Sequence, residues 1–356
     1  MKKTLYPRGG KLHTGVLALA LAFTLLGVAG SLMMRGQTRL PYADVQLAAA
    51  ERMADAEAAV LTYIKEHNIA VEQDDINQTG LIGPEWTELT TSLGLLEAKR
   101  TSLQPDFAAL MVKYYKQAGL AAGDTVCCGM SGSFPGLCIA AVAAANEMGL
   151  NVKAIASYGS SMYGGTRVEL PTIRILDIAR DAGILSFEML AVSPGGDYDQ
   201  GENVLFPQSR EVILAMAKEE GVPIIDEPDI VKSIQQRLLI FGQDVDCFVN
   251  IGGASANMGM SSYTLSFPNG LVLDPPRIPA NPDRGLTFEY AARGIPVIHL
   301  LNVRGLAQDN GIPFDPVPLT QPGETNVYCE THASPLPAII ALAALLVIGP
   351  LGGLAS

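Results

Sequence analysis

The sequence predicts an α/β fold, with a mostly parallel sheet covered by helices on both faces and a transmembrane helix flanking it at each end. From residue 124 onward, short apolar segments alternate with segments of helical length, which is typical of parallel strands joined by crossover helices. Residues 14–34 form an uncharged, mostly aliphatic run that is long enough to cross a bilayer. Residues 336–356 form a second uncharged run, rich in Ala, Leu and Ile.

Basic residues near the first run predict its orientation. Four precede it and two follow it closely, namely Lys2, Lys3, Arg8 and Lys11 before and Arg35 and Arg39 after. This excess predicts a cytoplasmic N-terminus, with the main domain outside the cell membrane. The alternative is a cleaved signal peptide over residues 1–34, although the apolar run is longer than the usual ~7–15 residues and lacks a clear Ala-x-Ala site.

The chain divides into five predicted parts. They are a cytoplasmic tail (1–13), a transmembrane helix (14–34), a helical stalk and packing region (35–104), an extracytoplasmic α/β domain (105–333) and a second transmembrane segment (336–356). In the stalk region, apolar residues recur at helical spacing over residues 42–67. A second helix fits residues 105–118, where Pro105 suits a first turn and Gly119 an end.

Alternating strands and helices fill the α/β domain. The predicted strands are residues 125–128, 152–157, 184–191, 247–251 and 296–301. The predicted helices between them are residues 137–148, 170–182, 209–221 and 229–242. Ligands of such sheets bind at the carboxyl ends of the strands, so we expect any site to lie there.

Composition excludes several classes of function. The chain has a formal net charge of −12, which argues against a nucleic-acid partner. It has five cysteines, an odd number, and no Cys-x-x-Cys motif, so neither a disulfide framework nor a zinc site is supported. No His-Glu-x-x-His motif or acidic metal-ligand spacing is present, and we expect no metal and no other cofactor.

The most informative stretch is a strand, a Gly/Ser elbow and a helix start over residues 125–137. It places Ser131 and Ser133 at a helix N-terminus, where an anion or a developing oxyanion is favoured. The elbow misses the pattern Gly-x-Ser-x-Gly at its last position and lacks the Gly-Lys-Ser/Thr ending of a P-loop. An ordinary strand-to-helix turn with serine caps is the alternative.

Three Gly/Ser loops follow three different predicted strands, at residues 129–136, 158–166 and 252–259. In a parallel sheet they emerge at one edge, so we expect them to line one pocket, although such loops are common turns in α/β proteins. The candidate ligand-binding residues in these loops are Gly132, Ser160, Ser161, Gly253, Ser255 and Asn257.

A serine nucleophile needs a base, and His299 is the only histidine at the end of a predicted strand. The candidate catalytic residues are therefore Ser131, Ser133 and His299. The hypothesis leaves Asp124, Asp246 and Asp274 open as the acidic member of a triad. The alternative for His299 is a core imidazole bonded to backbone.

Three polar residues near the loops suit a carboxylate ligand. Asn302 and Arg304 follow the predicted strand that carries His299, and Arg167 follows the second loop. Arginine binds a carboxylate through its planar fork of two donors. The alternative for each arginine is a surface salt bridge.

Three runs, residues 131–136 (SGSFPG), 250–255 (NIGGAS) and 294–306 (GIPVIHLLNVRGL), resemble the poly-gamma-glutamate system protein family. The resemblance covers most of the chain. It implies a bacterial membrane protein associated with poly-γ-glutamate capsule or polymer production, beside the synthetase and export components. It implies no catalytic residue set.

Together, the residues and the resemblance give two hypotheses. The first is a membrane-anchored accessory protein of poly-γ-glutamate synthesis or export, which binds the anionic polymer or the synthetase complex outside the bacterial cell membrane. Helix N-termini and arginines are suitable groups for holding its free carboxylates. The alternative is a serine hydrolase or transferase that cleaves or transfers the γ-glutamyl polymer through an acyl-enzyme.

Overall fold

The computed structural model describes residues 14–202, 205–275 and 277–353, which belong to two compact units. One unit combines the two ends of the chain, up to Leu40 and from Cys329 onward, and the other is Pro41–Tyr328. The predicted cytoplasmic tail and the last three residues of the second hydrophobic run lie outside the described residues.

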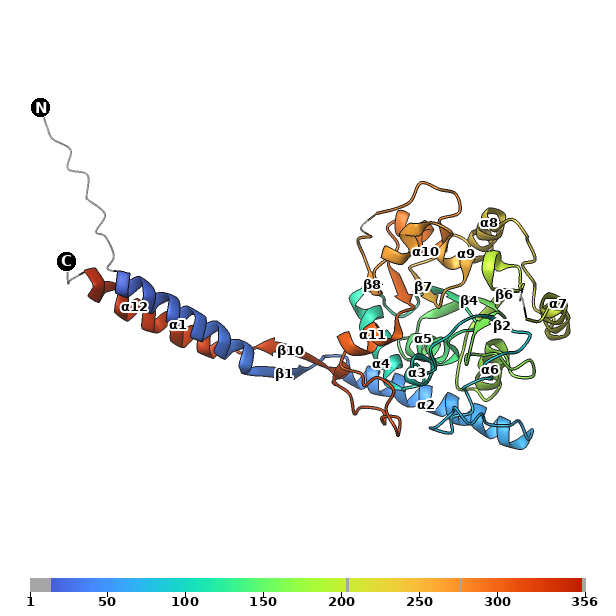
Figure 1. Ribbon diagram of the computed structural model, residues 1–356, viewed down its shortest axis with the longest axis horizontal. Coiled ribbons are helices and arrows are strands. Elements are labelled where there is room, and N and C mark those ends of the chain that lie inside the picture. The colour runs from blue at the N-terminus through green and yellow to red at the C-terminus, as the bar shows by residue number, and fades with distance from the viewer. Residues whose placement is uncertain (1–13, 203–204, 276, 354–356) are drawn as a thin grey trace, which may run out of the picture. The chain divides into compact units, whose positions relative to one another are not determined.

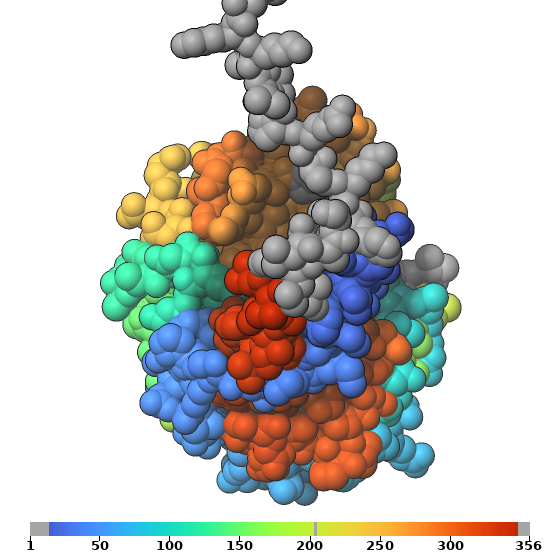
Figure 2. Space-filling model, turned by 90° about the vertical axis from the view of Figure 1, so that its left-hand side faces the viewer, coloured from blue at the N-terminus to red at the C-terminus, as the bar shows by residue number. Residues whose placement is uncertain are grey.

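The terminal unit is a pair of apolar helices joined to a short ribbon. Its elements are α1 (Thr14–Met33), β1 (Arg35–Arg39), β10 (Cys329–Ala333) and α12 (Leu336–Gly353), with β1 and β10 antiparallel. The helices α1 (blue) and α12 (red) lie against each other (Figure 2). Gly27 makes this approach possible, because a Cβ at that position would lie 2.6 Å from the Cβ of Ala341.

Helix α1 is long and apolar enough to cross a membrane, and most of its side chains are exposed. A signal sequence near an N-terminus has the same length and composition. In α12, the apolar stretch with described side chains is Leu336–Val347, which is shorter than the roughly 20 residues of a span. The described residues therefore show one candidate span, and the second stays a proposal.

The larger unit is built on a six-stranded sheet, as predicted mostly parallel (Figure 1). Its strand order is β6 (Glu188–Ser193), β4 (Asn151–Ser157), β3 (Thr125–Met130), β7 (Cys247–Ile251), β9 (Val297–Leu300) and β8 (Gly270–Val272). Only the edge strand β8 is antiparallel to its neighbour. The chain proceeds from β3 outward to β6 and then returns to β7, so the loops after β3 and β7 diverge at a switch point.

Helices cover both faces of this sheet (Figure 1). One face carries α2 (Ala43–Glu66), α4 (Asp106–Gln117), α5 (Pro135–Glu147) and α6 (Thr172–Asp181). The other face carries α8 (Ile230–Phe241), α9 (Ser255–Met258) and α10 (Gly285–Ala292). The Ala-rich α5 is buried on nearly all sides, because it lies between the sheet and the helices α2 and α4.

Shorter elements complete the unit. They are β2 (Thr90–Ser92) and β5 (Ser160–Ser161), which pair in parallel, the helices α3 (Leu96–Thr101), α7 (Ser209–Glu220) and α11 (Val303–Asp309), and the 3-10 turns η1 (Asp197–Asp199), η2 (Ser262–Ser266) and η3 (Asn326–Tyr328). Helix α3 packs against α11, which follows β9. Among these pieces, β2, β5, α3, η1 and α11 supply side chains to a pocket at the carboxyl ends of the strands.

Most predicted elements of the α/β domain are confirmed, and the main difference concerns the start of β6. The sequence predicts this strand from Ile184, but it begins at Glu188. Gly183 has a φ of +73°, and the amide of Ile184 donates to the carbonyl of Ala179. Ile184 therefore belongs to the turn that ends α6 and not to the strand. Residues 41–104 belong to the same compact unit as the sheet, and α2 packs on α4, α5 and α6.

Candidate functional site

A pocket of about 450 Å³ lies at the carboxyl edge of the sheet, around the switch point. As predicted, all three Gly/Ser loops contribute to it, together with residues after β6 and β9. The lining residues are Thr91, Ser92, Leu93, Gly94, Leu95, Ala98, Lys99, Ser131, Ser133, Phe134, Ser157, Gly159, Ser161, Gly196, Asp197, Gly253, Ala254, Leu301, Asn302, Val303, Arg304 and Phe314.

Gly132 joins two of these loops through its backbone. Its amide donates to the carbonyl of Gly159 (3.2 Å), and its own carbonyl accepts from the amide of Gly165 (2.8 Å). A Cβ at this position would lie 2.6 Å from the carbonyl oxygen of Tyr158. A glycine is therefore needed at position 132 because two chain segments approach each other closely there. Gly132 itself does not line the pocket.

Lys99 enters the pocket from α3, which lies outside the predicted α/β domain. Its Nζ donates to the backbone carbonyl of Ser133, lies 2.6 Å from Oγ of Ser161, and stands 3.8 Å from the ring centroid of Phe134. Only 2% of the residue is exposed, and this burial lowers the pKa of the amine to about 7. Among the described residues, no carboxylate forms an ion pair with Lys99.

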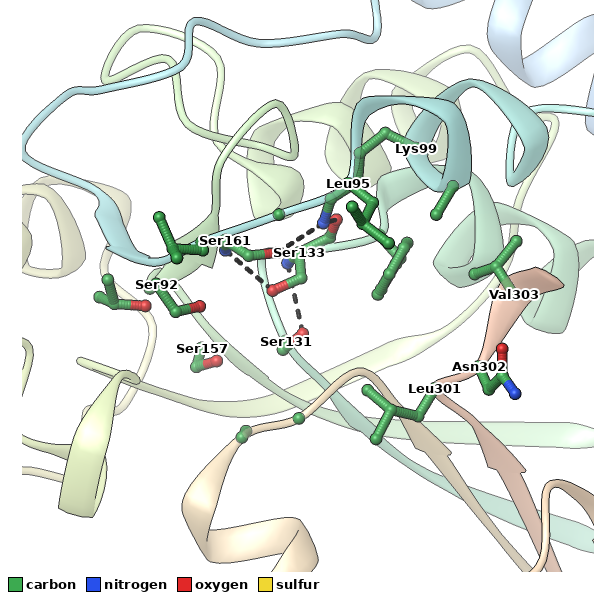
Figure 3. Close-up of a pocket in the computed structure, with 18 of the residues that line it drawn as sticks. Ser92, Leu95, Lys99, Ser131, Ser133, Ser157, Ser161, Leu301, Asn302 and Val303 are labelled. Carbon is green, nitrogen blue, oxygen red and sulfur yellow. Dashed lines mark hydrogen bonds between the residues drawn. The ribbon is translucent and has the colours of Figure 1, made fainter. Parts of the chain in front are cut away.

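Ser131, Ser133 and Ser161, three of the five serines that line the pocket, form a connected set with Lys99 (Figure 3). The amide of Ser161 donates to Oγ of Ser133 (3.0 Å), and the amide of Ser133 lies 3.3 Å from Oγ of Ser131, which accepts from it. Ser131 is almost fully buried, whereas Ser133 and Ser161 are partly exposed to the pocket. Each of these serines thus has a fixed position on the β3–α5 loop or on β5.

Asn302 and Arg304 lie at the end of the pocket that follows β9. Oδ1 of Asn302 accepts from the amide of Gly305 (3.1 Å) and caps α11. The exposed guanidinium of Arg304 stands 4.1 Å from the ring centroid of Phe314, and no acidic partner for it occurs in the part of the chain that the structure describes. Asp197 is the acidic residue among those that line the pocket. It follows β6, the edge strand on the side of the sheet away from β9.

The structure does not bring His299 to the pocket serines. Its Nδ1 lies 2.9 Å from Nδ2 of Asn250, its register partner on the adjacent strand β7, and its ring packs edge-on against Phe267. The residue is 3% exposed and does not line the pocket, and burial lowers the pKa of the imidazole to about 4. This geometry corrects the proposed Ser/His pair and fits a core imidazole.

The three aspartates considered as the acidic member of a triad, Asp124, Asp246 and Asp274, do not line the pocket. Asp246 accepts from the amide of Thr125, the first residue of β3, and Asp124 precedes that residue. Both therefore lie at the amino edge of the sheet, opposite the pocket. Asp274 follows the short edge strand β8 and is not among the lining residues.

Four further candidates hold the surrounding loops together and do not line the pocket. The buried Arg167 donates to the carbonyls of Gly80 (2.9 Å) and Ala70 (3.0 Å). The hydroxyls of Ser160 and Ser255 donate to backbone carbonyls, that of Ser160 to Ser161 (2.8 Å) and that of Ser255 to Gly196 (3.3 Å). The side chain of Asn257 packs against Gly129.

Sequence reasoning missed the wall that comes from residues 91–99, including Lys99. In the sequence this lysine stands in a Glu-Ala-Lys-Arg run, which is typical of a solvated helix surface. No local signal separates it from Arg100, whose side chain instead pairs with Asp315 (2.6 Å). Only the packing of α3 over the loop that contains Ser133 buries it.

Within residues 14–202, 205–275 and 277–353, no group of three or more His, Cys, Asp or Glu residues could hold a metal ion. In comparisons with known proteins, no family model, no curated protein and no solved structure matches the chain. The resemblance to the poly-gamma-glutamate system family therefore stays a prediction from its motifs.

Proposed function

We propose that the chain is a membrane-anchored accessory protein of poly-γ-glutamate synthesis or export, and that its pocket binds carboxylates of the anionic polymer. The polymer is proposed from the motif resemblance. The observation that carries the binding role is Arg304, whose guanidinium lies on Phe314 at the pocket and lacks an acidic partner among the described residues. Contact with the synthetase and export complex belongs to the same proposal.

The charges around the pocket favour one orientation of a ligand. The protein carries a net charge of −12, so a carboxylate needs local cations to bind. Arg304 and Lys99 both line the pocket, and Asp197 lies at the other end of the strand order. A carboxylate is therefore favoured beside Arg304, whose planar fork donates two parallel hydrogen bonds.

Replacing Arg304 tests this role. We expect Arg304→Gln to weaken the binding of γ-linked glutamate oligomers by about tenfold or more, because a charge-assisted pair of hydrogen bonds is lost. Arg304→Lys should recover only part of the affinity. Calorimetry with the full-length protein in detergent, at two salt concentrations, measures the effect.

Arg277 provides a matched control, because it is also an exposed arginine on an aromatic ring, 4.3 Å from the centroid of Tyr263, and does not line the pocket. Arg277→Gln should bind the oligomers as the wild type does. Equal affinities for Arg304→Gln and Arg277→Gln would refute the binding role of Arg304.

The proposal also places the main domain outside the cell membrane, with both apolar helices spanning it, and the cysteines allow a direct test. Cys127, Cys128, Cys138 and Cys247 are buried, whereas Cys329 is partly exposed. In intact cells that produce the protein, a membrane-impermeant maleimide should label the wild type but not Cys329→Ser. Labelling that requires permeabilised cells would place the domain on the cytoplasmic side.

A second candidate function, the hydrolysis or transfer of an acyl group, is favoured by a specific contact. Oγ of Ser161 lies 2.6 Å from Nζ of Lys99 inside the same pocket. A nucleophile beside a base is the arrangement that covalent catalysis requires.

A further inference from the structure

We propose that Ser161 and Lys99 form a catalytic pair for acyl transfer, in which Oγ of Ser161 is the nucleophile and Nζ of Lys99 is the general base. The substrate class is an amide whose acyl part carries a carboxylate. The carboxylate rests on the proposed function, because Arg304 would hold it, whereas the catalytic pair rests on its own geometry.

The geometry meets the requirements for a nucleophile and its base. The 2.6 Å between Nζ of Lys99 and Oγ of Ser161 is within hydrogen-bond reach for proton transfer. The amine is oriented by a second hydrogen bond, which it donates to the carbonyl of Ser133. Both side chains line the pocket, and Ser161 is partly exposed to it, so a substrate can reach the nucleophile while the base lies buried behind it (Figure 3).

The surroundings favour a neutral amine. Lys99 is buried against the ring of Phe134 and has no carboxylate partner among the described residues. A buried ammonium without such a partner is costly, which lowers its pKa to about 7. Near neutral pH, a large fraction of the amine therefore has the free electron pair that a base needs.

Ser161 is held firmly in front of this base. It belongs to β5, where it pairs with Ser92 of β2, and its amide donates to Oγ of Ser133 (3.0 Å). The segment that leads to Lys99 packs closely on the end of the same strand, since a Cβ at Gly94 would lie 2.5 Å from the carbonyl oxygen of Met162, the residue after Ser161. Nucleophile and base thus lie on elements that fix their separation.

Ser131 and Ser133, the neighbours of Ser161 in the pocket, are less suited to this role. Oγ of Ser133 accepts from the amide of Ser161, and Oγ of Ser131 accepts from the amide of Ser133. In the described part of the chain, neither hydroxyl has a hydrogen bond to a lysine or histidine side chain. Among the described hydrogen bonds of the five serines that line the pocket, only the hydroxyl of Ser161 contacts a lysine or histidine side chain.

The proposed reaction has two steps, acylation of Ser161 and release of the acyl group. Oγ of Ser161 attacks the carbonyl carbon of the amide while Nζ of Lys99 takes the hydroxyl proton. The C–N bond then breaks, the leaving nitrogen receives that proton, and an ester of Ser161 remains. Water attacks this ester to release a carboxylic acid, or an amine attacks it to form a new amide. Lys99 takes a proton from the attacking water or amine and gives it to Oγ of Ser161 as the ester C–O bond breaks, which restores the hydroxyl.

A fluorophosphonate probe tests the pair in the full-length protein, with the modified residue mapped by mass spectrometry. We expect labelling of the wild type at Ser161, no labelling at that position in Ser161→Ala, and a loss of about 100-fold or more in labelling rate for Lys99→Met. Lys99→Arg should not restore the rate, because arginine remains protonated.

The pH dependence of wild-type labelling does not depend on how any variant folds. Its rate should rise most steeply around pH 7, where Lys99 loses its proton, and level off at higher pH. No labelling of the wild type, labelling at a different serine, or a rate that is flat across this range would overturn the proposal. A lysine that only ties α3 to the loop at Ser133 predicts the flat profile.

These outcomes are separable from failure of the proposed function. The probe carries no carboxylate, so its labelling reports the nucleophilicity of Ser161 whatever the pocket binds. The binding of glutamate oligomers is measured by calorimetry through Arg304. Loss of one result therefore leaves the other interpretable.

Discussion

Asp199→Ala is expected to lower the free energy of unfolding by about 3–5 kcal/mol, because it leaves a buried charge without its partner. Asp199 is 3% exposed and accepts from Nη2 of Arg237 (2.7 Å) on α8. It also accepts from Oγ of Ser193 (2.8 Å), Oγ of Ser233 (3.0 Å) and the amide of Gly195 (3.1 Å). Alanine would leave the guanidinium of Arg237 buried and unpaired.

This network also holds one wall of the pocket. Asp199 closes the turn η1, which has the lining residues Gly196 and Asp197 at its start, and its own φ of +65° is held by these contacts. Urea denaturation followed by circular dichroism measures the loss of stability. The control is Asp226→Ala, since Asp226 pairs with Arg210 while both side chains are more than one third exposed, and such pairs contribute about 0–1 kcal/mol. Similar losses for the two variants would contradict the prediction.

The fold could be predicted because its strands and helices carry local patterns. The apolar run at β7 and the Ala-rich run at α5 are each bounded by glycine or polar turns, and their boundaries differ by a few residues at most from those predicted. The elements that were missed include the eight-residue helix α10 and the strands β2 and β5, which have three and two residues. Strands of that length exist only through pairing with a distant segment, and no local pattern encodes that pairing.

The pocket could be placed from the sequence, but its chemistry could not. Parallel strands bring their carboxyl ends to one edge, so the Gly/Ser loops that contain Ser133, Ser161 and Gly253 were expected to meet. The prediction that His299 faces the pocket serines was wrong, because a single polar residue in an apolar strand does not show what its side chain faces. His299 faces Asn250 through the register of β7 and β9, and Lys99 reaches Ser161 across 62 positions of sequence.

Lys99→Met should change how stability depends on pH. Burial lowers the pKa of this amine to about 7 in the folded protein, whereas in the unfolded chain it stays near the ordinary value of 10.5. Between these values the unfolded chain binds more protons, so the free energy of unfolding of the wild type rises with pH. We expect the free energy of unfolding of the wild type, relative to that of Lys99→Met, to rise by about 2 kcal/mol from pH 7 to pH 9. Below about pH 6 the difference between the two proteins should change little.

Denaturation curves at several pH values measure this difference, and titrations shared by both proteins cancel in it. Lys232→Met is the matched control, because it removes one positive charge from an exposed position without emptying a buried one. The pH dependence of the free energy of unfolding also bears on the proposed role of Lys99 as a general base. A neutral amine in a buried site costs the fold stability at neutral pH, and that neutrality is what lets Lys99 accept a proton from Ser161. A wild type whose stability parallels that of Lys99→Met from pH 7 to pH 9 would show an amine that stays protonated, and Ser161 would then lack its base.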